Sequence, residues 1–163
     1  KYEAQGGATF REAYLALEQT RQPAPARRQL LRWLVFNYLV GNSDAHAKNI
    51  SFLVDARGLS LAPFYDLLCA KVYGDDTMAM TLGGELRYGW VTSKAWDEVA
   101  RDLGIRPAYL RRLRLELAKD LLRAVPGILA RAEFTDEERQ FLVKVAAIID
   151  EHARFVLEGL QGA

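Results

Sequence analysis

The segment over residues 26–41 constrains the fold most, because it is apolar on nearly every side of a predicted helix. A helix that is hydrophobic all round is buried in the middle of a domain. This helix is too short to span a bilayer, and Arg27, Arg28 and Arg32 mark its exposed start. Its apolar residues are Leu30, Leu31, Trp33, Leu34, Val35, Phe36, Tyr38, Leu39 and Val40.

A polar stretch follows this helix, and a predicted β-hairpin comes directly after it. The stretch reads Gly41-Asn42-Ser43-Asp44-Ala45-His46-Ala47-Lys48-Asn49. Residues 50–54 are typical of a strand, residues 55–58 of a hairpin turn and residues 59–61 of the return strand. Asp66 then follows in Phe64-Tyr65-Asp66, seventeen residues after Asn49. Two side chains with oxygen ligands therefore bracket the hairpin.

The order Asp44, Asn49 and Asp66 meets the requirements of phosphoryl transfer from ATP. That reaction needs a carboxylate to orient the acceptor hydroxyl and take its proton, and hard oxygen ligands to hold Mg²⁺ against the phosphates. Protein kinases use an Asp, an Asn five residues later and a second Asp beyond it. Asp44 and Asn49 have this spacing. The pattern therefore predicts an ATP- and magnesium-dependent phosphotransferase.

These residues also have structural interpretations. Asp44 and Asn49 favour turns, and Asp66 is a candidate N-cap for a helix that begins at Leu67. A zinc site at His46 would need scattered ligands such as His152, which disfavours it. The ordered set of three residues around a hairpin favours the catalytic interpretation.

The chain resembles the C-terminal lobe of the HipA-like toxin kinases, most densely between residues 33 and 85. The helix-into-loop segment is Phe36-Asn37-Tyr38-Leu39-Val40-Gly41-Asn42-Ser43-Asp44, and the metal-binding segment is Leu61-Ala62-Pro63-Phe64-Tyr65-Asp66-Leu67-Leu68. Further similar pieces are Lys1-Tyr2-Glu3 with Gly6-Gly7, and Ala79-Met80 with Gly83-Gly84.

The resemblance implies a mainly α fold with a short β-hairpin, a protein-kinase-like C-terminal lobe over residues 1–163. It implies Asp44 as the catalytic base and Asn49 and Asp66 as Mg²⁺ ligands. His46 and Lys48 complete the implied catalytic set: they lie close to the ATP phosphates or brace the loop, and His46 is also an implied ATP-binding residue. ATP and Mg²⁺ are the implied cofactors.

The resemblance also implies partners. Family members phosphorylate Ser or Thr hydroxyls of protein targets as toxins of type II toxin–antitoxin modules. Their partner is a small DNA-binding antitoxin, which can bring operator DNA close. They carry an N-terminal lobe with the nucleotide-clasping loop and lysine, and this chain begins after the corresponding point. We therefore expect the isolated chain to bind ATP–Mg²⁺ weakly and to transfer little phosphate.

Two other functions remain open. The chain could be a catalytically dead module that docks an antitoxin or DNA. It could also be a small-molecule phosphotransferase of the aminoglycoside or choline type, which shares the Asp, Asn and Asp around the same hairpin. An acidic substrate pocket would favour that second alternative.

Composition limits the partners and the compartment. Half of the residues are apolar, 26% are charged and the net charge is +1, so no global field favours nucleic acid or a membrane. The single cysteine, Cys69, excludes an intrachain disulfide and suits a reducing cytoplasm. It lies in an apolar setting that is typical of a buried thiol.

The second half of the chain predicts further helices, at about 94–103, 107–131 and 136–158. Residues 96–113 also have the spacing of a helix-turn-helix, with Ala100, Gly104, Ile105 and Leu110 at its key positions. Its arginines would meet DNA phosphates; the alternative is a pair of packed helices with a solvated basic face. These arginines are Arg106, Arg111, Arg112 and Arg114.

The ends of these helices are predicted from capping residues. Thr9 and Thr135 open capping boxes, and Ser93 is a third expected N-cap. Gly104 and Gly159 are expected to stop helices, and Pro126-Gly127 to kink or end the long one early. Residues 71–92 have no clear periodicity. Three tryptophans are expected in the core: Trp33, Trp90 and Trp96.

Overall fold

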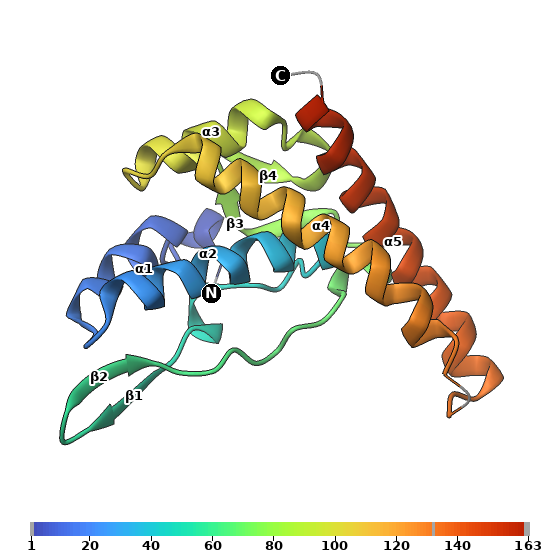
Figure 1. The fold of residues 1–163 in the computed structure, drawn as a ribbon, viewed down its shortest axis with the longest axis horizontal. Helices are drawn as coiled ribbons and strands as arrows, with labels where there is room; N and C mark the ends of the chain where they lie inside the picture. Colours follow the sequence, from blue (N-terminus) through green and yellow to red (C-terminus); the bar gives the residue numbers. More distant parts are fainter. Residues whose placement is uncertain (1, 132, 162–163) are drawn as a thin grey trace.

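The fold is built around helix α2 (Pro23–Val40), which runs through the middle of the molecule (Figure 1). The computed structural model describes residues 2–131 and 133–161. Helices α4 (Pro107–Leu129) and α5 (Asp136–Gln161) pack along each other, and both contact α2. Helix α1 (Phe10–Ala16) lies beside the first half of α2, and α3 (Ser93–Asp102) packs on α4. The mainly helical architecture expected from the sequence is confirmed.

Helix α2 forms the core, as its composition predicted. Leu30, Val35 and Leu39 are fully buried. The helix ends at Gly41, whose φ of +71° lets Asn42 N–H donate to Asn37 O over 2.9 Å. A Cβ on Gly41 would lie only 3.0 Å from Ile148 Cγ2. The sharp exit from α2 therefore requires glycine for both its conformation and its space.

The predicted hairpin is confirmed as strands β1 (Phe52–Asp55) and β2 (Gly58–Leu61), an antiparallel pair. It projects from the helical body (Figure 1). One anchor is the backbone of Arg21, whose N–H donates to Leu59 O over 2.8 Å. The irregular segment after β2 then returns the chain toward α2.

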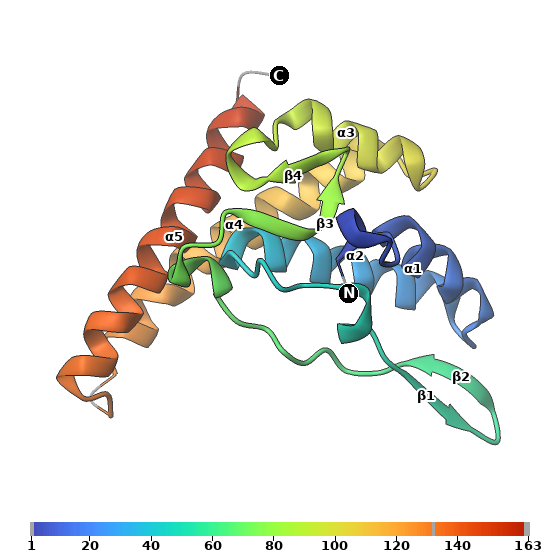
Figure 2. The ribbon, with the colours of Figure 1, turned by 180° about the vertical axis from the view of Figure 1, so that it is seen from behind.

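A second hairpin occupies part of the region that showed no periodicity. Its strands are β3 (Thr77–Leu82) and β4 (Glu85–Arg87), and they lie in front of α4 in Figure 2. The residues over 78–80 are all buried, so β3 lacks the alternation of a half-exposed strand. Gly83 and Gly84 both have positive φ, as a two-residue type I′ turn requires.

The turn between β3 and β4 supplies a stability test. A Cβ on Gly83 would lie 2.2 Å from Ala95 O, whereas a Cβ on Gly84 would have no atom within 4 Å. We expect Gly83→Ala to lower the free energy of unfolding by more than about 3 kcal/mol, because strain adds to a backbone clash. Gly84→Ala should lower the free energy of unfolding by only about 1 kcal/mol, because alanine at a positive φ is strained but meets no other atom. Urea unfolding of both variants checks this, and equal losses would contradict it.

The predicted capping boxes are both present. Thr9 and Glu12 exchange hydrogen bonds at the start of α1, and Thr135 and Glu138 do so before α5. Gly104 also ends α3 as predicted, with a φ of +66°. Short 3-10 helices complete the described elements: η1 (Glu3–Gln5), η2 (Leu17–Gln19), η3 (Ala47–Asn49), η4 (Ala70–Tyr73) and η5 (Tyr88–Trp90).

Four predictions about the second half were wrong. Ser93 is not an N-cap: α3 is preceded by Thr92, and Ser93 Oγ donates instead to Gly159 O over 2.9 Å. That bond satisfies a carbonyl in the last turn of α5, which does not stop at Gly159 but continues to Gln161. Of the two effects expected of Pro126-Gly127, a kink or an early end, the early end was wrong: α4 continues to Leu129, because packing against α5 outweighs the local cost of proline. Trp90 is 59% exposed, and the guanidinium of Arg87 lies over its ring.

The described helices contain no segment that is both long and apolar enough to cross a membrane.

Candidate active site

Asn42 connects the two candidate carboxylate residues to the end of α2. Its Nδ2 donates to Asn37 Oδ1 over 2.7 Å and to the backbone carbonyl of Asp66 over 2.9 Å. Its Oδ1 accepts from the backbone N–H of Asp44 over 3.3 Å. Asn37 is fixed in turn by a 2.8 Å bond to Trp33 O. The buried core helix therefore sets the positions of residues that are twenty-two apart in the sequence.

Asn49 and Asp66 meet, as the spacing predicted. Asn49 Nδ2 donates to Asp66 Oδ2 over 2.6 Å. Asn49 is buried at the end of η3, and its Oδ1 has no hydrogen-bond partner among the described residues. A buried amide oxygen without a partner is costly, and a ligand that accepts its lone pair removes that cost.

The oxygen atoms of Asn49 and Asp66 suit Mg²⁺ better than they suit a metal ion whose ligands all come from the protein. One amide oxygen and one carboxylate are hard oxygen ligands of the kind that Mg²⁺ prefers. In the part of the chain that the structure describes, no group of three His, Cys, Asp or Glu is placed to hold a metal. Mg²⁺ suits such a sparse site, because it commonly takes its other ligands from water and phosphate.

Asp66 has an unusual backbone. Its φ is +58°, and it is the one described non-glycine residue with positive φ. Asp tolerates this conformation better than most residues, but it still carries a cost that surrounding contacts must offset. Residues 62–69 form no helix, so Asp66 is not an N-cap. The conformation leaves its side chain exposed beside Asn49.

Asp44 is half-buried and contacts the N-terminal segment. The hydroxyl of Tyr2 donates to Asp44 Oδ1 over 3.0 Å. Glu3 fixes this segment, because its two carboxylate oxygens accept from the N–H and the hydroxyl of Thr81, each over 2.8 Å. This contact joins the segment that contains Tyr2 to the polar stretch that contains Asp44, which are two of the segments that carry the family resemblance. Lys1 lies outside the described residues. The β3 strand therefore holds Tyr2 against Asp44.

His46 and Lys48 are placed differently from each other. His46 is buried, and its ring lies edge-on to Tyr2 with centroids 6.4 Å apart, a position that braces the loop. The Lys48 side chain is exposed, while its carbonyl accepts from the Tyr65 hydroxyl over 2.9 Å. Tyr65 thereby ties the loop to the segment that carries Asp66. Sequence reasoning missed Asn42 and Tyr2, which lie within the motifs that it quoted.

The contact between Tyr2 and Asp44 predicts a graded effect. Tyr2→Phe removes one hydrogen bond to the carboxylate but keeps the ring against His46. We expect kcat for phosphate transfer to fall by about 10- to 100-fold, the loss of one bond to a charged group, with KM for ATP unchanged. Steady-state kinetics check this. A change in KM alone would show that Tyr2 acts on nucleotide binding instead.

The structure weakens the helix-turn-helix alternative and also disfavours catalysis by Cys69. Arg114 is buried at 2% exposure with its guanidinium over the Trp96 ring, so it is not placed for the contact with DNA phosphates that the helix-turn-helix alternative required. Burial lowers the pKa of Arg114 to about 10. Cys69 is half-buried, and burial raises the pKa of its thiol, which opposes a nucleophilic role.

Comparison with known proteins identifies the family. A family model described as the HipA-like C-terminal domain matches residues 1–125. The chain belongs to the HipA-like family. This HipA-like chain is 35% identical over 132 residues to the protein named "Putative kinase Y4mE" of Sinorhizobium fredii. It is 36% identical over 81 residues to the serine/threonine-protein kinase toxin HipA of Shewanella oneidensis. The HipA-like family therefore includes proteins named as kinases.

The HipA-like fold also matches a solved structure. The complex of Shewanella oneidensis HipA with HipB and its operator DNA aligns with a TM-score of 0.84 and 24% identity, over 95% of this chain. The chain spans 31% of the Sinorhizobium protein and 19% of the Shewanella toxin in the sequence alignments, and 38% of the solved chain. The named activities thus belong to proteins of which this chain matches a minor part.

Proposed function

We propose that this chain is the C-terminal catalytic lobe of an ATP- and Mg²⁺-dependent kinase that phosphorylates Ser or Thr hydroxyls of proteins. The observation that carries the proposal is the hydrogen bond of Asn49 with Asp66, together with the bonds by which Asn42, at the end of α2, holds the backbones of both Asp66 and Asp44. The same Asp, Asn and Asp order serves phosphoryl transfer in protein kinases.

Each residue has a distinct role in this mechanism. Asp44 orients the acceptor hydroxyl and takes its proton, and Tyr2 keeps the Asp44 carboxylate turned toward that position. Asn49 and Asp66 hold Mg²⁺, which offsets charge on the phosphates when it is bound. Asn42 positions both carboxylate residues, and His46 packs the loop against Tyr2. Lys48 is exposed and available to the phosphates.

The biological setting is proposed from relatives. Shewanella oneidensis HipA is named as a toxin kinase, and its solved complex contains HipB and operator DNA. We extend that setting to this chain: the full-length protein is the toxin of a toxin–antitoxin module, and a small DNA-binding antitoxin is its partner.

Transfer of labelled phosphate tests the kinase proposal. The full-length protein is incubated with [γ-³²P]ATP and Mg²⁺, with host lysate as acceptor, and labelled proteins are hydrolysed to identify the modified amino acid. We expect label on Ser or Thr, lost on chelation of Mg²⁺. Label on a small molecule would favour an aminoglycoside- or choline-type phosphotransferase. Absence of transfer despite bound ATP would favour a catalytically dead docking module.

A further inference from the structure

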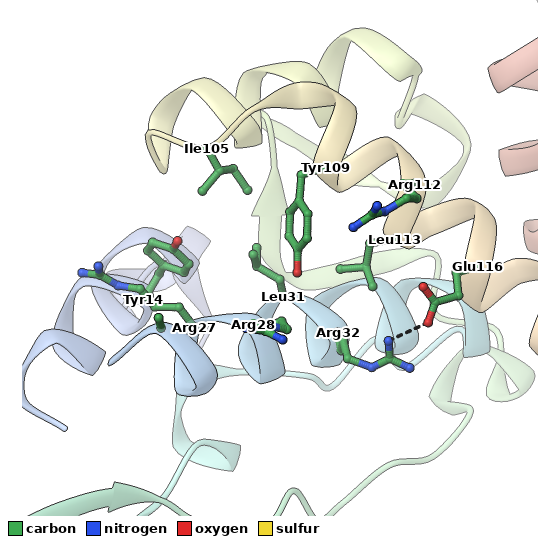
Figure 3. A pocket seen from close by; sticks show the side chains of 11 residues that line it. Tyr14, Arg27, Arg28, Leu31, Arg32, Ile105, Tyr109, Arg112, Leu113 and Glu116 are labelled. Atoms are coloured by element: carbon green, nitrogen blue, oxygen red, sulfur yellow. Dashed lines mark hydrogen bonds and ion pairs between the residues drawn. The ribbon is translucent and has the colours of Figure 1, made fainter. Parts of the chain in front are cut away.

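A cavity unrelated to the candidate active site lies on the other side of α2. It measures about 560 Å³, is open to solvent, and is lined by α1, the first half of α2 and the start of α4 (Figure 3). Figures 1 and 2 show α4 on one side of α2 and the segment over residues 41–49 on the other. None of the candidate catalytic residues lines this cavity. A ligand bound here would therefore not compete directly with the phosphotransfer proposed above.

The charge of the cavity is strongly positive. One acidic residue, Glu116, lines it, and its carboxylate pairs with Arg32 over 2.9 Å across the gap between α2 and α4. That ion pair neutralises only one of the arginines that line the cavity. Four arginines line the cavity: Arg27, Arg28, Arg32 and Arg112.

Two of these arginines have no acidic partner among the residues that the structure describes. Arg27 pairs with Glu18 over 2.6 Å and lies over the Tyr14 ring, so it is part of the wall. Arg28 and Arg112 are exposed, and no described carboxylate lies within ion-pair distance of either. They come from facing helices and open on the same cavity. Two guanidinium groups without an acidic partner among the described residues therefore contribute positive charge to facing walls of the same cavity.

The rest of the lining is apolar and aromatic. Leu31 and Leu113 are buried beneath the opening, and Tyr109 is half-buried beside Arg112. Figure 3 shows Tyr109 and Leu113 pointing from α4 toward Leu31 on α2. A cavity of about 300–1,000 Å³ with an apolar lining and a few convergent polar groups is typical of small-molecule sites. Such a lining accommodates a flat or apolar body next to the anion.

We propose that this arginine cavity binds a phosphate-bearing small molecule with a flat or apolar body, of the size and charge of a nucleoside monophosphate. A phosphate monoester carries about −1.5 to −2 charges at neutral pH, which matches the two unpaired guanidinium groups. Arg28 and Arg112 bind the phosphate, and Tyr109 with the leucines contacts the ring.

Two larger occupants fit the cavity less well. An extended peptide needs backbone donors and acceptors, but the lining comes mainly from the sides of helices, whose backbone groups are already paired. Duplex DNA presents phosphates on a convex surface, whereas Arg28 and Arg112 open into a hollow. The shape therefore favours a compact ligand that enters the cavity.

Calorimetric titration tests the proposal. Uridine 5′-monophosphate, uridine and inorganic phosphate are each titrated into the protein with EDTA present, so that Mg²⁺-dependent binding is excluded. We expect the monophosphate to bind at least about tenfold more tightly than either fragment. Arg28→Gln and Arg112→Gln should each raise its Kd at least about tenfold, the loss of one charge-assisted contact. Asp66→Asn should leave the Kd unchanged.

The matched control is Arg106→Gln, because Arg106 is an exposed arginine at the start of α4 that does not line the cavity. It removes the same charge and should leave the Kd within about twofold. If Arg106→Gln raised the Kd of the monophosphate as much as Arg28→Gln and Arg112→Gln do, the arginines would act only through the overall charge of the protein, and the proposal would be overturned. Absence of monophosphate binding, or tighter arginine-dependent binding of duplex DNA or of a glutamate-rich peptide, would also overturn it.

Discussion

Replacing Asp66 with asparagine is expected to lower phosphate transfer by the full-length protein at least about 1,000-fold, because a magnesium ligand and its charge are lost together. The variant should fold normally. Asp66 is exposed, and asparagine tolerates its φ of +58° at least as well as aspartate. Its backbone carbonyl can still accept from Asn42.

Two measurements check the Asp66 prediction. Initial rates of transfer are recorded over a range of Mg²⁺ concentrations, and urea unfolding reports stability. We expect the free energy of unfolding to change by less than about 1 kcal/mol. Activity close to that of the wild type at ordinary Mg²⁺ concentrations would remove Asp66 from the metal site.

Replacing Asn42 with alanine is expected to lower both stability and activity. The change leaves Asn37 Oδ1, the Asp66 carbonyl and the Asp44 N–H without their partner. Asn42 itself is only 3% exposed, so water cannot easily replace these bonds. We expect a loss of about 2–4 kcal/mol in unfolding free energy. Transfer per folded molecule should fall at least about 100-fold, because both carboxylate residues lose a fixed position.

The neighbouring buried residue Ser43 supplies the control for Asn42. Ser43→Ala removes a buried hydroxyl that lies outside the described hydrogen bonds of Asn42. Ser43→Ala should lower the free energy of unfolding without a loss of kcat comparable to that of Asn42→Ala. If Asn42→Ala lowers stability while kcat per folded molecule stays at the wild-type value, Asn42 is part of the core and does not position the site.

Local sequence patterns were sufficient for the central part of this molecule. The apolar helix and the first hairpin each depend on neighbouring residues, so periodicity and turn chemistry predicted them. Asn49 and Asp66 meet because that hairpin is short and returns the chain to its start. Their predicted roles as magnesium ligands remain a proposal that only binding and activity can test.

Longer-range contacts account for what the sequence did not predict. Glu3 and Thr81 are 78 residues apart, and no local pattern shows that their bonds hold Tyr2 against Asp44. The β3 strand is buried on both faces and therefore has no alternation. Arg114 looked like a surface arginine, but its guanidinium stacks on Trp96 inside the helical layer. In each case tertiary packing overrode the local signal.

The Asp44→Asn variant of the full-length protein, compared with Asp55→Asn, tests the central claim most directly. Both replace a carboxylate by an amide of the same shape, but Asp55 is the exposed last residue of β1, next to the hairpin turn. With [γ-³²P]ATP and Mg²⁺ we expect Asp44→Asn to lose transfer by at least about 100-fold, the usual contribution of a general base. Asp55→Asn should retain it. Equal, wild-type-like transfer by both variants would contradict the assignment of Asp44 as the residue that activates the acceptor hydroxyl.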